Sequence, residues 1–160
     1  MPVRIGPYEV ARELGKGGMG VVHAAHDPAL DRWVAIKLLR APAFASPDEV
    51  GRLKQEAQAA ARLRHPSIAA VHALGMHEGR PYLVMDLVEG ESLEARLARE
   101  GPLQPREAAR ITAALARALQ HAHERGVTHR DVKPSNVLLD ARGAPVLIDF
   151  GLTRILDRAT

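Results

Sequence analysis

The amino-acid sequence predicts an α+β fold, in which antiparallel strands come first and most helices come later. Five apolar stretches have the length and the bordering turns of strands: residues 8–14, 21–25, 33–39, 70–74 and 81–85. One helical pattern interrupts them after the third stretch, and two more follow residue 91. This order differs from the regular strand–helix alternation of a parallel α/β fold.

The helix that follows the third strand has a clear start signal. Ser46 can cap it, Pro47 suits the first helical position, and Glu49 can complete a capping box. Apolar residues then recur at helical spacing, and Pro66 stops the helix. We therefore expect one helix between the third and fourth strands.

The second part of the chain is predicted to be mainly helical. Helices begin at Ser92 and Pro105, and Gly126 suits the end of the second one. Short strands at 137–139 and 145–148 then form a hairpin. We expect a small C-terminal hairpin packed against two helices.

The composition excludes several classes of protein. The chain has 160 residues, of which 46% are hydrophobic and only 3% aromatic, so its core is aliphatic. It contains no cysteine, which excludes disulfide frameworks and cysteine-based zinc sites. The net charge is +3 and no basic run exceeds two residues, so we expect no nucleic-acid partner. No signal peptide and no apolar run long enough to span a membrane are present.

A glycine-rich segment lies between the first two strands. Gly15 to Gly20 reads Gly-Lys-Gly-Gly-Met-Gly, a G-x-G-x-x-G pattern. In a dinucleotide-binding turn a helix starts inside this pattern, but here Val21 and Val22 continue as a strand. The segment therefore favours a hairpin whose backbone N–H groups approach phosphate oxygens. A plain flexible hairpin turn is the alternative.

Lys37 lies in the otherwise apolar third strand. A charge in that position is costly unless it is paired. Glu56 is the predicted partner because it lies beside Leu53 and Ala57 on the buried side of the following helix. Such a pair would direct the ammonium toward the α- and β-phosphates of a nucleotide. The alternative is a surface lysine, but only 4 of the 22 Lys and Arg residues are lysine.

Two polar motifs follow the long helix. Residues 129–136 read His-Arg-Asp-Val-Lys-Pro-Ser-Asn, and residues 148–151 read Ile-Asp-Phe-Gly. They match H-R-D-x-x-x-x-N and D-F-G, in the expected order of helix, loop, strand, turn and strand. Two unrelated polar loops are the alternative, which the presence of four motifs in order argues against.

The residue types in these motifs suit phosphoryl transfer, which depends on positioning and charge neutralisation. Asp131 can accept the proton of a substrate hydroxyl, and Lys133 can neutralise the γ-phosphate. Asn136 and Asp149 offer the hard oxygen ligands that Mg²⁺ prefers.

Together the four motifs resemble those of eukaryotic-type Ser/Thr protein kinases. The amino-acid sequence of residues 82–90 is most similar to that of the bacterial members of this family. The resemblance covers residues 8–153. It implies a protein-kinase-like fold with a five-stranded N-lobe and one helix at 1–87, followed by an incomplete C-lobe at 88–160. It also implies Ser/Thr specificity, and control through Arg130 by phosphorylation of the activation segment.

The resemblance further implies a site for ATP and Mg²⁺, with Mn²⁺ as a substitute. Met85 would be the gatekeeper residue, and residues 86–88 would form the hinge. The implied nucleotide-binding residues are Leu14, Gly15, Lys16, Gly17, Gly18, Gly20, Val22, Ala35, Lys37, Met85, Asp86, Val88 and Leu138. The catalytic residues would be Asp131, Lys133, Lys37 and Glu56, and the metal ligands Asn136 and Asp149.

The printed chain ends shortly after the Asp-Phe-Gly motif, where a family member would continue with further helices. We therefore expect the long helix to be partly exposed along Ile111, Leu115 and Leu119, and the 160 residues alone to be poorly soluble and to transfer little phosphate. Thr153 and Thr160 are candidate phosphorylation sites.

Three functions are open. The first is an active cytoplasmic Ser/Thr kinase that acts on protein substrates and pairs with a second kinase domain. The second is a truncated relative that binds nucleotide or regulates a kinase. The third, a small-molecule phosphotransferase, is disfavoured by the glycine-rich loop and by the His-Arg-Asp-x-Lys-Pro-x-Asn motif.

Overall fold

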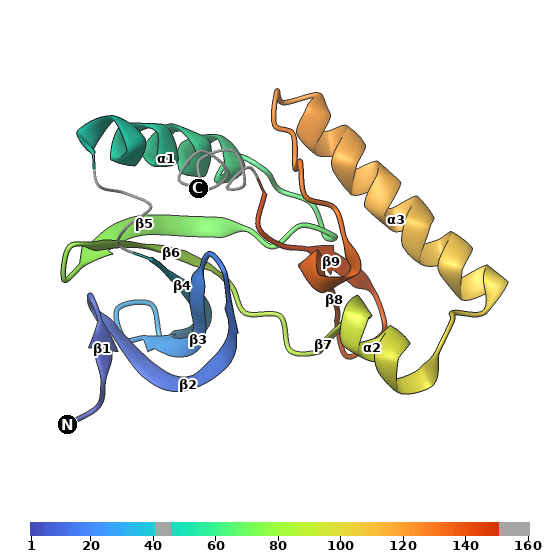
Figure 1. Ribbon diagram of the computed structural model, residues 1–160, viewed down its shortest axis with the longest axis horizontal. Coiled ribbons are helices and arrows are strands. Elements are labelled where there is room, and N and C mark those ends of the chain that lie inside the picture. Colours follow the sequence, from blue (N-terminus) through green and yellow to red (C-terminus); the bar gives the residue numbers. More distant parts are fainter. Residues whose placement is uncertain (41–45, 151–160) are drawn as a thin grey trace.

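The computed structural model describes residues 1–40 and 46–150. Gly151 of the Asp-Phe-Gly motif and the candidate phosphorylation sites Thr153 and Thr160 lie outside this part. The described chain forms a curved sheet covered by one helix, joined to a second unit of helices and short strands (Figure 1). The predicted α+β fold is confirmed.

The first unit is a six-stranded antiparallel sheet with the order β1-β2-β3-β4-β6-β5. Its strands are β1 (Arg4–Ile5), β2 (Tyr8–Gly17), β3 (Gly20–Asp27), β4 (Arg32–Leu39), β5 (Val71–His77) and β6 (Arg80–Asp86). Five were predicted. The sixth, β1, has only two residues, too few to carry a periodic pattern, so the predicted count of five is corrected to six.

Strand β4 separates two parts of the core. Val34 and Ile36 belong to a cluster on one face of the sheet, whereas Ala35 and Leu39 belong to a cluster on the other. Side chains of a strand alternate between faces, so Lys37 shares its face with Ala35. The sheet therefore presents the lysine beside a small side chain.

Helix α1 (Pro47–Ala60) begins where the sequence predicts. The Ser46 hydroxyl accepts a hydrogen bond from the Glu49 N–H at 3.3 Å, and the Glu49 carboxylate accepts one from the Ser46 N–H at 3.2 Å. This capping box satisfies two donors that the helix end would leave free. The helix ends at Ala60, before Pro66, because the chain then turns to bury Leu63.

The second unit contains β7 (Glu91–Ser92), α2 (Leu93–Glu100), α3 (Pro105–His123), a short 3-10 helix (Pro134–Asn136), β8 (Val137–Leu139) and β9 (Pro145–Leu147). The last two strands form the predicted hairpin, and β7 adds a third strand. On α3, Leu115 and Leu119 are half-buried, as expected. Ile111 was expected to be partly exposed but is buried, because it packs in the apolar cluster with Leu139 and Leu147. Within the described residues, no helix is long and apolar enough to cross a membrane.

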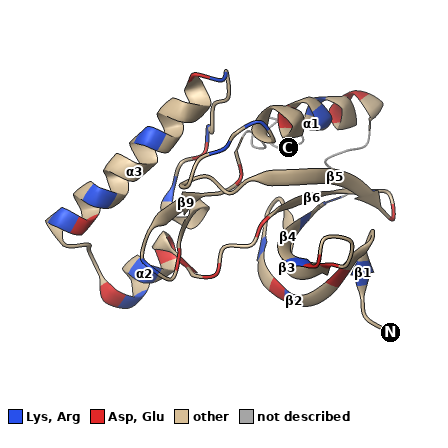
Figure 2. Ribbon diagram, turned by 180° about the vertical axis from the view of Figure 1, so that it is seen from behind, with Lys and Arg blue, Asp and Glu red and all other residues tan. Residues whose placement is uncertain are grey.

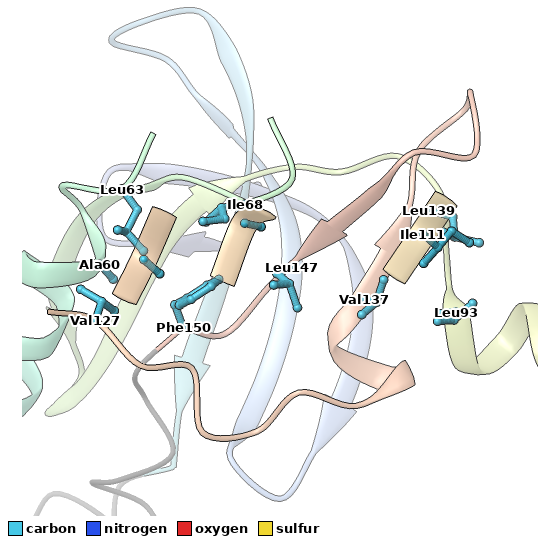
Figure 3. Packing of buried hydrophobic residues seen from close by; sticks show 12 residues of the cluster. Ala60, Leu63, Ile68, Leu93, Ile111, Val127, Val137, Leu139, Leu147 and Phe150 are labelled. Atoms are coloured by element: carbon cyan, nitrogen blue, oxygen red, sulfur yellow. The ribbon is translucent and has the colours of Figure 1, made fainter. Parts of the chain in front are cut away.

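One apolar cluster joins the two units (Figure 3). Ala60 and Leu63, from the end of α1, pack in the same cluster as Ile111 of α3 and Leu147 of β9. Leu147 has no exposed surface. The cluster therefore fixes the end of α1 to the hairpin that carries the second polar motif.

Replacing Ser46 by Ala should lower the free energy of unfolding by about 1 kcal/mol, because the capping box loses its hydroxyl. Urea denaturation of the full chain measures this loss. Ser46→Asp is the matched control and should keep most of the stability, since aspartate caps helices equally well. Equal stability of the alanine variant and the parent would show that the box does not stabilise α1.

Candidate active site

The glycine-rich segment forms the hairpin between β2 and β3. Gly17 pairs with Gly20, and Gly15 pairs with Val22, which in turn pairs with Lys37 of β4. Gly15, Val22 and Lys37 are therefore neighbours across the adjacent strands β2, β3 and β4. Exposed residues of this segment include Leu14, which is 39% exposed, and Lys16.

Two kinds of glycine occur in this hairpin. A Cβ at Gly15, Gly17 or Gly18 would meet no other atom within 4 Å, so these three leave open space above the backbone. A Cβ at Gly20 would lie 2.1 Å from the carbonyl oxygen of Leu38. Gly20 is therefore required for the close approach of β3 to β4, whereas the other three leave room for a ligand.

Lys37 is a buried cation with a half-buried acidic partner. Its side chain is 6% exposed, and its Nζ donates to Oδ2 of Asp149 at 2.8 Å. The Met19 sulfur, at the tip of the glycine hairpin, lies 3.8 Å from the same Nζ. The structure thus brings the hairpin, the strand lysine and the acid of the second polar motif to one place.

The structure shows an ion pair of Lys37 that was not predicted from the sequence. The ammonium pairs with Asp149, at the end of the β8–β9 hairpin. Asp149 has a φ of 61°, a conformation that aims its carboxylate at β4. Glu56 lies half-buried on α1, and its role stays a prediction.

His129 supports the loop that carries Asp131. Its ring is buried, with 1% of the residue exposed. The Nδ1 atom accepts a hydrogen bond from the Asp131 N–H at 3.1 Å. The Nε2 atom therefore carries the proton and donates to the Ile148 carbonyl at 2.6 Å. The Phe150 ring packs edge-on against it, with 4.6 Å between the ring centres. Burial lowers the pKa of His129, which keeps the ring neutral. The histidine therefore ties the two polar motifs together.

Asp131 is held by two neighbours from its own loop. The Asn136 side-chain nitrogen donates to the Asp131 carbonyl at 2.8 Å and to its Oδ2 at 3.1 Å. The Lys133 ammonium lies 3.2 Å from the same Oδ2. These contacts fix the orientation of the carboxylate, whose side chain remains 23% exposed for an incoming hydroxyl.

The two polar loops contain backbone strain. Arg130 has a φ of 69° and Asp149 a φ of 61°, in the left-handed region that non-glycine residues rarely adopt. Asp31 and Glu78, the other described non-glycine residues with positive φ, lie in hairpin turns. Such strain costs on the order of 1–3 kcal/mol per residue and is typical of functional sites.

Asn136 and Asp149 lie at the same end of the β8–β9 hairpin, where the Ile148 N–H donates to the Asn136 carbonyl at 3.1 Å. The Asn136 amide nitrogen is used by Asp131, so its side-chain oxygen is the atom left for a cation. In the described part of the chain, no cluster of three or more His, Cys, Asp or Glu residues could hold a metal ion. A divalent cation here would take its other ligands from phosphate and water, as Mg²⁺ commonly does.

Only some of the residues predicted to contact the base lie together on one face of the sheet. Val22, Ala35 and Met85 belong to the same apolar cluster. Leu138 of β8 is half-buried. The Asp86 carboxylate accepts from the Ala70 N–H at 2.8 Å and lies 2.7 Å from the His72 ring, so a nucleotide contact from Asp86 would come from its main chain.

Because burial depresses the pKa of His129 below 6.5, the unfolded chain binds more protons than the folded chain as the pH falls through that value. The free energy of unfolding should therefore decrease from about pH 7.5 to about pH 5.5. Urea denaturation at both pH values should show a smaller decrease for His129→Gln. The variant must be compared with the parent because burial also lowers the pKa of His65, which contributes to the pH dependence of both proteins. Equal decreases in the two proteins would contradict the assignment.

Comparisons with known proteins agree with this geometry. The family model described as "Protein kinase domain" matches residues 8–160. Serine/threonine-protein kinase PrkC of Bacillus subtilis is 40% identical over 155 residues, which are 97% of this chain and 24% of the relative. Serine/threonine-protein kinase PknB of Mycobacterium leprae is 42% identical over 157 residues, with 96% and 25% covered.

A solved structure shares the fold. The PknI kinase domain of Mycobacterium tuberculosis superposes with a TM-score of 0.85 at 38% identity, covering 94% of this chain and 60% of that one. This chain spans about a quarter of the length of the curated relatives, since it covers 24% of PrkC and 25% of PknB. With its glycine hairpin, its buried lysine and both polar loops in place, the chain belongs to the protein kinase domain family.

Proposed function

We propose that this chain is the nucleotide-binding and catalytic-loop part of a protein kinase that transfers the γ-phosphate of ATP to Ser or Thr hydroxyls. The observation that carries the proposal is a pair of contacts, Lys37 with Asp149 at 2.8 Å and Asn136 with Asp131 at 2.8 and 3.1 Å, on two loops that the hydrogen bond from the Ile148 N–H to the Asn136 carbonyl holds together. Names of the relatives support the Ser/Thr class. The residue roles given below are part of the proposal.

Asp131 would accept the proton of the substrate hydroxyl. Its carboxylate is oriented by Asn136 and is partly exposed, as a group that meets a substrate must be. The Lys133 side chain is 52% exposed, and its ammonium contacts Oδ2 of Asp131. From this position the ammonium can also neutralise negative charge on the transferred phosphoryl group. The neutral, buried His129 would position the loop and take no part in proton transfer.

Lys37 and the glycine hairpin would hold the phosphates of ATP. The ammonium is already oriented by Asp149, and the side-chain-free backbone around Gly15 and Gly17 can approach phosphate oxygens. Val22, Ala35, Met85, Leu14 and Leu138 would contact the base, with main-chain contacts from Asp86 and Val88. Glu56 is a candidate second partner for Lys37 when Asp149 binds a metal ion.

The donor set fits Mg²⁺, and Mn²⁺ has similar preferences. Asp149 and Asn136 would hold the ion, which neutralises charge on the transferred phosphoryl group when it is bound. The Lys37–Asp149 bond holds one of these ligands in place before the ion arrives.

Asp131→Asn should reduce phosphate transfer to a Ser/Thr peptide by about 100- to 10,000-fold, because the substrate hydroxyl loses its proton acceptor. The assay follows labelled γ-phosphate in the intact kinase domain that includes this chain. Asp48→Asn, at an exposed position in the first turn of α1, is the matched control and should leave the rate unchanged. Full activity of Asp131→Asn would overturn the assignment of the base.

Asn136→Ala should raise the Mg²⁺ concentration needed for half-maximal transfer by about tenfold or more, since an oxygen ligand is lost. Chelation of divalent ions should abolish transfer by the parent. The Mg²⁺ dependence is the informative measurement, because Asn136 also orients Asp131. A slower rate with unchanged Mg²⁺ dependence would limit Asn136 to that orienting role.

A further inference from the structure

A cavity of about 670 Å³ lies beside the segment that joins the two units. We call it the Trp33 cavity. Four separate parts of the chain line it: the start of β4 at Trp33, the α1–β5 connection at Ile68, the joining segment 86–89, and the β8–β9 turn at Arg142. It shares the predicted hinge residues Asp86, Leu87 and Val88 with the predicted nucleotide site. A ligand here would contact both units without covering the catalytic loop.

Trp33 makes this cavity unusual. It is the one tryptophan of the sequence and is 56% exposed, with only an edge contact to the His26 ring at 5.4 Å. The apolar side chains of Leu87, Ile68 and Val146 continue the lining. An exposed tryptophan at a cavity with a mixed apolar and polar lining is typical of sites that bind another protein, where such residues contribute much of the affinity.

The charges around the cavity have an acidic excess. Asp86, Glu89 and Asp140 line it against the single guanidinium of Arg142, whereas the chain as a whole has a net charge of +3. Two of the carboxylates are fixed in place by the backbone: Asp86 by the Ala70 N–H at 2.8 Å, and Asp140 by the N–H groups of its own turn at 2.8 and 2.9 Å.

Glu89 is the carboxylate that a ligand can engage. It is exposed, and it forms no ion pair within the described ranges 1–40 and 46–150. An indole face next to carboxylates suits a cationic side chain, which gains both a cation–π contact and an ion pair. The apolar part of the lining suits a neighbouring aliphatic side chain.

We propose that the Trp33 cavity binds a peptide segment that places an arginine or lysine beside an apolar residue. That this segment belongs to a protein substrate of the kinase rests on the proposed function; the binding itself does not. Since the lining includes the joining segment and both units, a docked segment would tether the substrate without occupying the site of phosphate transfer.

The test uses fluorescence of Trp33 in the full chain, titrated with a hexapeptide of alternating leucine and arginine. The leucine–arginine peptide should quench the emission and bind about tenfold or more tightly than its leucine–glutamate counterpart. Glu89→Lys should weaken binding about fivefold, and Arg142→Glu should strengthen it by a similar factor. The second variant keeps the test valid if the first one folds poorly. Glu94→Lys, on α2 outside the cavity, is the matched control and should change nothing.

Equal binding of the two peptides, or unchanged binding in both Glu89→Lys and Arg142→Glu, would overturn the proposal. Failure of the proposed function gives a different result, because the arginine peptide then binds while the intact domain transfers no phosphate. Conversely, transfer of phosphate without any discrimination between the peptides would leave the kinase assignment in place and exclude the docking site.

Discussion

The ion pair between Lys37 and Asp149 is the contact on which the site depends. It joins β4 of the sheet to the end of the β8–β9 hairpin across 112 positions of sequence, with 6% and 15% of the two side chains exposed. A buried ion of this kind is destabilising unless it is paired, and loss of one partner from such a pair typically costs about 3–5 kcal/mol. The pair therefore fixes the distance between β4 and the end of the β8–β9 hairpin.

The surrounding structure holds this pair in place. The apolar cluster that contains Leu63, Ile111 and Leu147 joins the two units, and His129 links both polar loops through hydrogen bonds at either ring nitrogen. This rigidity offsets the strained backbone of Arg130 and Asp149. Figure 2 shows that charged residues occur along α1, α2 and α3. The geometry of the candidate site is thus a product of packing at the junction of the two units.

The same junction also forms the Trp33 cavity. The segment 86–89 borders this cavity, and Met85 directly before it belongs to the apolar cluster that contains Ala35. Neighbouring residues would thus contribute to two surfaces with different chemistry, the proposed nucleotide site near Lys37 and a cavity with an acidic excess beside an indole. Specificity for ATP and recognition of a protein partner would then be located on neighbouring but separate surfaces.

The sequence by itself determined the elements and the residue types of the site. The capping box at Ser46, the glycines between β2 and β3, and the spacing of the two polar loops all act locally, so their patterns predict both structure and chemistry. Two-residue strands such as β1 have no periodicity and escaped prediction. Only the tertiary structure decided that Lys37 meets Asp149, because the two residues lie 112 positions apart and no local pattern joins them. It alone also assembled the Trp33 cavity, whose four segments meet only when both units pack together.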